Sequence, residues 1–187
     1  MSRWRLIAGG AAALIAIFAV YSFFLADESV APPSIRIAFA TAVIGEGEEA
    51  LGVTPYGEVL SGKPAPKEGT LPSLPDVPPP KNGRLSGPML AQAKVLGAAP
   101  EPLRPCIARS YHGESGVDVE LRSGIEVRFG DPTRVAEKWV AAIALLADPA
   151  ITALDYVNVS SPARLSTGGS GHSLPAAGEG EGEGCGT

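Results

Sequence analysis

The stretch that decides the fold runs from residue 117 to residue 130 and reads VDVELRSGIEVRFG. Apolar residues alternate with charged residues on both sides of Ser123-Gly124, which is the period-two pattern of two half-buried strands joined by a tight turn. The apolar positions are Val117, Val119, Leu121, Ile125, Val127 and Phe129. The pattern predicts an antiparallel hairpin with one face toward a core and the other toward solvent.

A helix is predicted directly after this hairpin. Asp131 can accept hydrogen bonds from the free amides of a first helical turn, and Pro132 suits the first helical position, where no amide hydrogen is needed. Asp148-Pro149 ends the helical pattern. Spacings of four, four and three place one apolar face on Val135, Trp139, Ile143 and Leu146, with Arg134, Glu137 and Lys138 elsewhere on the helix. Trp139 is therefore predicted to be a core residue.

A final strand is predicted at 156–160, which reads YVNVS and is broken at Pro162. By periodicity Val157 and Val159 face the core. Beyond Gly168 the chain is rich in glycine and glutamate, so the fold is expected to end near Leu165, and residues 169–187 are expected to be a disordered tail.

The part before the hairpin predicts shorter elements. Short β-rich runs occur at 34–39, 42–44, 51–54, 58–60 and 103–111, and a helix capped by Ser86 runs through Leu96. Seven prolines between Pro64 and Pro80 exclude a helix or a central strand there, which favours an extended surface connector over a docking peptide for a proline-binding domain. Because strands outnumber helices, the sequence predicts an α+β fold with a mainly antiparallel sheet and two helices on one face.

A charge-free apolar run from Leu6 to Ala26 is long enough to span a hydrocarbon core of about 30 Å. It is too long for a cleaved signal, the alternative, and Phe24 stands where a cleavage site needs a small residue. Arg3 and Arg5 precede the run, which places the N-terminus in the cytoplasm. The predicted organisation is a cytoplasmic tail (1–5), a single transmembrane helix (6–26), a linker (27–34), an extracytoplasmic β domain (35–168) and the tail (169–187).

Three segments together resemble the end of the FtsQ/DivIB family of bacterial cell division proteins. They are 121–130 (LRSGIEVRFG), the helix with Lys138-Trp139, and 156–164 (YVNVSSPAR). The family has a strand ending in Leu-Gly or Phe-Gly, a helix with a central lysine, and a last strand of the form Tyr-Ile-Asp-Val-Ser-x-Pro-x-Arg-Pro. Asn158 stands at the position of that aspartate, and Leu165 at that of the final proline.

The resemblance extends to 56–60 (YGEVL) and to 71–74 (LPSL), which is similar to a Leu-Pro-x-Leu crossing of the family. Members of the family ordinarily carry a POTRA domain between the membrane anchor and the β domain. Only eight residues separate Ala26 from Ile35, so the resemblance implies a chain that lacks most of that domain.

The resemblance also implies a function. If the final strand lies at a sheet edge, its unpaired amides and carbonyls can receive a partner strand by β-augmentation. In FtsQ-like proteins this region receives the FtsB/DivIC partner, which travels with FtsL and acts indirectly on FtsW and FtsI. The matching positions, expected to face the partner, are Tyr156, Asn158, Ser160, Ser161 and Arg164. The expected protein is a single-pass scaffold of the cell membrane at the division septum.

Two alternatives remain open. One is a POTRA-less paralogue that acts as an adaptor for another envelope partner; the other is a membrane-anchored envelope enzyme. The inventory of reactive groups favours neither metal nor cofactor binding nor catalysis, because the two histidines, His112 and His172, have no second ligand at metal-site spacing and no Gly-x-Ser-x-Gly elbow occurs. The part of the chain after Ala26 has 13 basic and 20 acidic residues, a charge of −7 that argues against nucleic acid.

The two cysteines, Cys106 and Cys185, can form a disulfide in an exported domain. Cys185 lies among glycines, which do not fix the geometry that a disulfide needs. Cys106 is therefore interpreted as a strand residue with a thiol, and the sequence does not decide whether the two residues pair.

Overall fold

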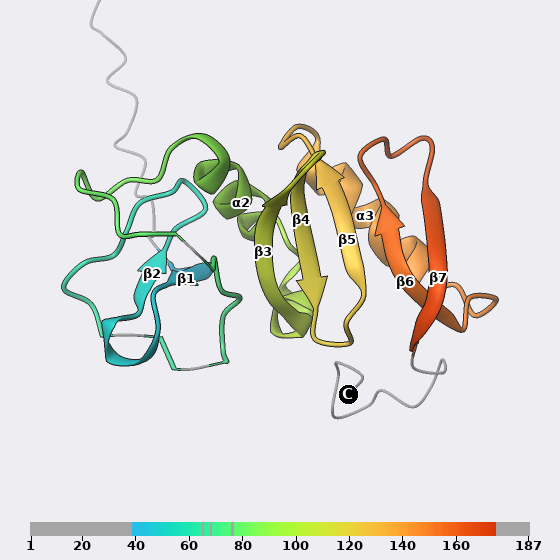
Figure 1. The fold of residues 1–187 in the computed structure, drawn as a ribbon, viewed down its shortest axis with the longest axis horizontal. Helices are drawn as coiled ribbons and strands as arrows, with labels where there is room; N and C mark the ends of the chain where they lie inside the picture. Colours follow the sequence, from blue (N-terminus) through green and yellow to red (C-terminus); the bar gives the residue numbers. More distant parts are fainter. Residues whose placement is uncertain (1–38, 65, 68, 76, 175–187) are drawn as a thin grey trace, which may run out of the picture. The chain divides into compact units, whose positions relative to one another are not determined.

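The computed structural model describes residues 39–64, 66–67, 69–75 and 77–174, which form an α+β fold (Figure 1). Its main sheet has five strands in the order β3-β4-β5-β6-β7. The strands are β3 (Ile107–Gly113), β4 (Gly116–Leu121), β5 (Glu126–Gly130), β6 (Ala153–Asn158) and β7 (Ser166–Ser173). Strands β4 and β5 pair antiparallel and confirm the hairpin that the alternating pattern predicted.

The main sheet is mainly antiparallel, as predicted, but it contains one parallel pair that the sequence did not predict. Strand β6 pairs parallel to β5, with Val127 opposite Val157. The two strands are joined by helix α3 (Val135–Leu146), and a strand that returns through a crossover helix enters the sheet in the same direction as the first. Helices α2 (Gly87–Gly97) and α3 lie behind the sheet in Figure 1, and no helix of the described residues covers its other face.

Helix α3 begins later than predicted. Its N-cap residue is Arg134, which has a left-handed backbone with φ of 51°, rather than Asp131. The Asp131 carboxylate instead accepts a hydrogen bond from the Thr133 amide at 2.8 Å. This is a bond of the kind that an N-cap at Asp131 makes, but the left-handed backbone of Arg134 interrupts the helical conformation, so the regular helix begins at Val135.

Lys138 of α3 is buried, although the helical pattern placed it off the apolar face. Its side chain is 1% exposed, and its ammonium donates to the backbone oxygens of Phe129 at 2.9 Å and Asp131 at 2.8 Å. A buried ammonium needs such acceptors, because burial without them costs several kcal/mol. The lysine therefore ties α3 to the end of β5.

Trp139, the predicted core residue, is fully buried. Its ring packs against that of Phe129 with centroids 4.6 Å apart, and its indole nitrogen donates to the Val95 oxygen at 2.9 Å. Val95 lies in the last turn of α2, where backbone oxygens have no partner within the helix. One side chain thus joins β5, α3 and α2.

The N-terminal part of the described chain forms a small sheet of β1 (Ala42–Ile44) and β2 (Leu51–Val53), with the 3₁₀ helix η1 (Gly47–Glu49) between them. A second 3₁₀ helix, η2 (Glu101–Cys106), precedes β3, so that strand begins later than the predicted start at Leu103. Cys106 ends η2 rather than lying in a strand, and it is not a free thiol. Cys185 lies outside the described residues.

The proline-rich segment does not simply run over the surface. Ser73 forms bridges to Val43 of β1 on one side and to Arg109 of β3 on the other. Its amide donates to the Ala108 oxygen at 3.0 Å, and the next amide, of Leu74, donates to the Val43 oxygen at 2.8 Å. The two non-proline residues between Pro72 and Pro75 therefore supply one amide donor to each neighbouring strand. A longer strand through this segment would include prolines, which have no amide hydrogen to donate.

The fold does not end near Leu165, because β7 follows and covers the edge of β6. Strand β7 reads STGGSGHS and pairs antiparallel with β6, with Tyr156 opposite Gly168. A glycine-rich run has no hydrophobic period from which a strand can be predicted. The part of β7 from Gly169 onward also belongs to the segment expected to be a disordered tail, so that expectation is corrected for residues 169–173.

The predicted fold class included a transmembrane helix, and for the described residues this part of the prediction is corrected. No helix within residues 39–64, 66–67, 69–75 and 77–174 is long and apolar enough to cross a membrane. The run from Leu6 to Ala26 that carried the prediction lies outside the described residues, as do the predicted cytoplasmic tail and linker.

Replacing Lys138 by methionine tests the buried tether. The change keeps the aliphatic stem but removes the donor to Phe129 and Asp131, and we expect the free energy of unfolding to fall by about 1 to 3 kcal/mol in urea titrations. Lys94→Met, on the exposed side of α2, is the matched control and should change stability by less than about 0.5 kcal/mol. Equal effects of the two changes would contradict a role for Lys138 in holding α3.

Candidate functional site

The free edge of β7 is the first feature that can receive another molecule. Strand β7 is the last in the order of the main sheet, so one side of its backbone has no neighbouring strand among the described residues. Natural edge strands are usually blocked by charged residues or prolines, but Ser166–Ser173 has neither. The backbone of β7 is therefore open to pairing by a partner strand.

The other edge of the sheet differs. Strand β3 is bridged by Ser73, whose oxygen accepts the Ser110 amide at 3.0 Å and whose amide donates to Ala108. Part of this edge is thus already paired within the chain. The two edges are not equivalent, and β7 is the more accessible one.

The glycines of β7 make room for side chains of β6. A Cβ atom at Gly168 would lie 2.6 Å from a ring carbon of Tyr156, and one at Gly169 would overlap a carboxylate oxygen of Asp155. The Gly171 amide donates to the Asp155 carboxylate at 2.6 Å. Glycine is required here because the space of the missing side chains is filled by the neighbouring strand.

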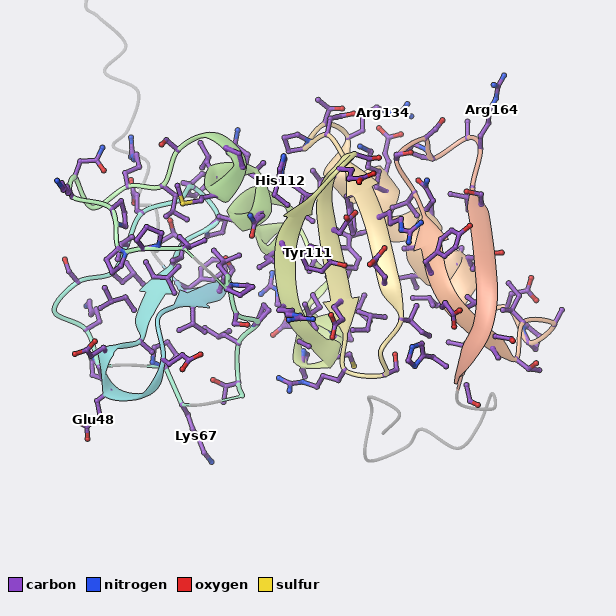
Figure 2. The ribbon with its side chains drawn as sticks, viewed as in Figure 1. Glu48, Lys67, Tyr111, His112, Arg134 and Arg164 are labelled. Atoms are coloured by element: carbon purple, nitrogen blue, oxygen red, sulfur yellow. The ribbon has the colours of Figure 1, made fainter. Side chains whose placement is uncertain are left out.

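A chain of polar contacts crosses the helix-free face of the main sheet. Tyr111 of β3 (Figure 2) donates its hydroxyl to Glu126 of β5, which also accepts from Arg128. The Arg128 guanidinium lies 4.0 Å from the centre of the Tyr156 ring, a cation–π contact. Burial raises the pKa of Tyr111, its hydrogen bond to Glu126 raises it further, and the contacts that Glu126 receives lower the pKa of that carboxyl despite its burial. The network orients Tyr156 from the side opposite β7.

Asp118 of β4 lies between Tyr111 and Arg128 in the register of the sheet and is 8% exposed. One of its carboxylate oxygens is buried without a hydrogen-bond partner in the described part of the chain. Burial, and then the negative charge of Glu126, raise the pKa of Asp118 to about 6, while Arg128 and His112 oppose the shift. This oxygen is an unsatisfied acceptor in the face of the sheet.

The predicted partner-facing residues divide into two groups. Tyr156 and Asn158 belong to β6, which is paired on both sides, so the strand expected at the edge is an inner strand and that expectation is corrected. Ser160, Ser161 and Arg164 are exposed in the loop between β6 and β7, and Figure 2 shows Arg164 pointing away from the sheet. Val157 and Val159 are fully buried.

The sequence did not predict the residues that shape the free edge of the sheet. Asp155, Gly168, Gly169 and Gly171 were either unremarked or assigned to the end of the fold and its tail. A usable signal was present, because glycine inside a strand often marks a close approach of another group. It required knowing that 166–173 is a strand.

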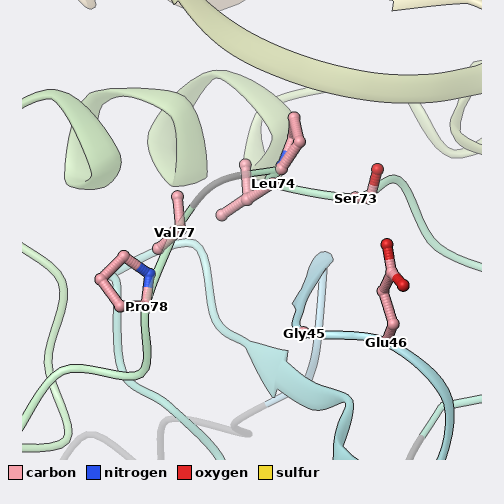
Figure 3. A pocket seen from close by; sticks show the side chains of 7 residues that line it. Gly45, Glu46, Ser73, Leu74, Val77 and Pro78 are labelled. Atoms are coloured by element: carbon pink, nitrogen blue, oxygen red, sulfur yellow. The ribbon is translucent and has the colours of Figure 1, made fainter.

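A pocket of about 390 Å³ opens beside Ser73 (Figure 3). Figure 3 shows Leu74, Val77 and Pro78 on one side and Glu46 and Ser73 on the other. One carboxylate and one hydroxyl do not form a set of nucleophile, base and orienting group. Within the described ranges, no group of three histidine, cysteine, aspartate or glutamate residues is placed to hold a metal ion.

Comparison with protein-family models and with curated proteins finds no match to this chain. The FtsQ/DivIB resemblance therefore rests on the quoted residues alone.

Asp118→Asn tests the buried carboxylate through pH. Because the folded state raises the pKa of Asp118 from an ordinary value of about 3.9 to about 6, the folded protein binds this proton more tightly, and its stability falls as the pH rises from about 4 to about 6. The amide variant lacks this fall. We expect it to match the parent near pH 4 and to exceed it by about 1 to 3 kcal/mol near pH 7 in urea unfolding. A difference that stays constant with pH would refute the assignment.

Proposed function

We propose that this chain is a non-catalytic adaptor of the FtsQ/DivIB type, and that a strand of an FtsB/DivIC-like partner adds to the free edge of β7. The observation that carries the proposal is this edge, which has neither charge nor proline and lies directly after the segment that resembles the family's last motif. An FtsL-like protein accompanies the partner, and the assembly acts indirectly on FtsW and FtsI.

The corrected topology supports the same mechanism at a different strand. In β-augmentation the backbone supplies affinity, and side chains around the edge supply specificity. With β6 inside the sheet, β7 provides the backbone, and the exposed loop residues Ser160, Ser161 and Arg164 lie at its beginning. Tyr156 and Asn158 take part only as far as their side chains extend past β7.

The proposed place of action is the division septum at the cell membrane. This location distinguishes the divisome adaptor from the alternative, a paralogue that uses the same edge of β7 for another envelope partner. A fluorescent fusion of the full chain in its own cell is expected to gather at midcell during constriction. An even distribution around the envelope, with binding by β7 retained, would favour the other partner.

A pair of proline variants tests strand addition. Along an antiparallel strand, neighbouring residues direct their amides alternately toward and away from the paired strand, so one of Ser166 and Thr167 directs its amide outward. Ser166→Pro and Thr167→Pro should therefore differ. One should be destabilised by loss of a bond to β6, and the other should fold normally but bind the FtsB/DivIC-like partner at least about tenfold more weakly.

Ser166→Ala and Thr167→Ala serve as controls, because they change the same side chains and keep both amides. Hydrogen exchange gives an independent readout, since the outward amides of β7 should become protected when the partner binds. If both proline variants fold and bind as the parent does, the partner does not pair with β7.

A further inference from the structure

We infer that the incoming strand is recognised through the glycines of β7 by Asp155 and Tyr156 of the inner strand β6, and that the fitting strand carries a lysine or arginine beside Asp155. This inference rests on the proposed function, because it names the chemistry of the partner that adds to β7. It assigns recognition to side chains that lie one strand away from the edge.

Asp155 replaces the side chains that β7 lacks. Its carboxylate occupies the space beside Gly169 and Gly171 and accepts the Gly171 amide at 2.6 Å. The register of β6 and β7 is irregular between Leu154 and Tyr156, where Asp155 meets the longer segment of β7. This irregularity and the absence of Cβ atoms bring the carboxylate to the outer strand.

Asp155 has charge that is not neutralised within the described chain. It is exposed, it makes one hydrogen bond, to a backbone amide, and no ion pair joins it to a described arginine or lysine. Arg128, on the neighbouring strand β5, is already bonded to Glu126 and stacked on Tyr156. A basic side chain on the incoming strand is the complementary partner for this carboxylate.

Tyr156 adds a second point of recognition at the next register position. Its ring and hydroxyl lie over Gly168, within 2.8 Å of the place that a Cβ atom would take. Arg128 holds the ring from the β5 side at 4.0 Å, and the hydroxyl makes no hydrogen bond with the described residues. The hydroxyl is therefore positioned to bond a polar side chain placed opposite Gly168.

Conservative variants test the two contacts without removing the packing. Asp155→Asn keeps an oxygen for the Gly171 amide and removes the charge, and Tyr156→Phe keeps the ring between Arg128 and Gly168 and removes the hydroxyl. Two probes are used: the FtsB/DivIC-like protein of the same cell, and short synthetic strands that alternate threonine with either lysine or glutamate. Binding is measured by fluorescence anisotropy at low and at high ionic strength.

The parent should bind the lysine strand at least about tenfold more tightly than the glutamate strand at low ionic strength, and salt should reduce this preference. Asp155→Asn should remove most of the preference, and Tyr156→Phe should weaken binding of the natural partner severalfold. Asp148→Asn is the matched control, because Asp148 is also an exposed carboxylate that accepts one backbone amide, from Ala150 at 2.9 Å. It should leave the preference unchanged.

The outcomes separate the two proposals. If the parent binds neither the natural partner nor either synthetic strand, the proposed function fails. If β7 amides become protected but Asp155→Asn and Tyr156→Phe bind as the parent does, strand addition stands and this inference is overturned. Sedimentation that shows a dimer lost in the β7 proline variants would identify a second copy of the chain as the occupant and would overturn it as well.

Discussion

The ammonium of Lys138 donates to two backbone oxygens at the end of β5, while the indole of Trp139, the next residue, donates to the last turn of α2. These contacts fix α3 against both the sheet and the second helix. Because α3 carries the chain from β5 to β6, its position decides that β6 enters parallel to β5. Everything after α3, including the edge strand, depends on this docking.

The edge strand β7 shows how such a scaffold supports a binding surface. Glycine gains little from strand formation and contributes no side chain to packing, so a run of serine and glycine is a weak strand by itself. Here β7 is held by β6, whose Tyr156 and Asp155 occupy the spaces over its glycines. The same side chains that stabilise the strand also present a carboxylate and a hydroxyl beside its glycines. Stability and recognition therefore share the same residues.

Local pattern was enough to predict part of this structure. The hairpin of β4 and β5, the helix with Trp139 and the helix after Ser86 follow from periods that a short window contains. The start of α3 was wrong because Arg134 has a left-handed backbone, which interrupts the helix that a cap at Asp131 would begin. The burial of Lys138, which was placed off the apolar face, was missed because a hydrophobic period does not reveal the two backbone oxygens at the end of another strand that accept from its ammonium. Strand β7 was missed because glycine and serine carry no period.

The sequence by itself determined where apolar faces form, because alternation and helical spacing act between residues that are close in the chain. It also placed the family-like motif at 156–164, next to the candidate site. Only the tertiary structure decided which strand lies at the edge and which side chains reach it. Those properties arise from the crossover through α3 and from the pairing of Tyr156 with Gly168, contacts between segments whose sequences do not specify each other's positions. Edge and register are set by packing across the sheet, and packing is a property of the assembled chain.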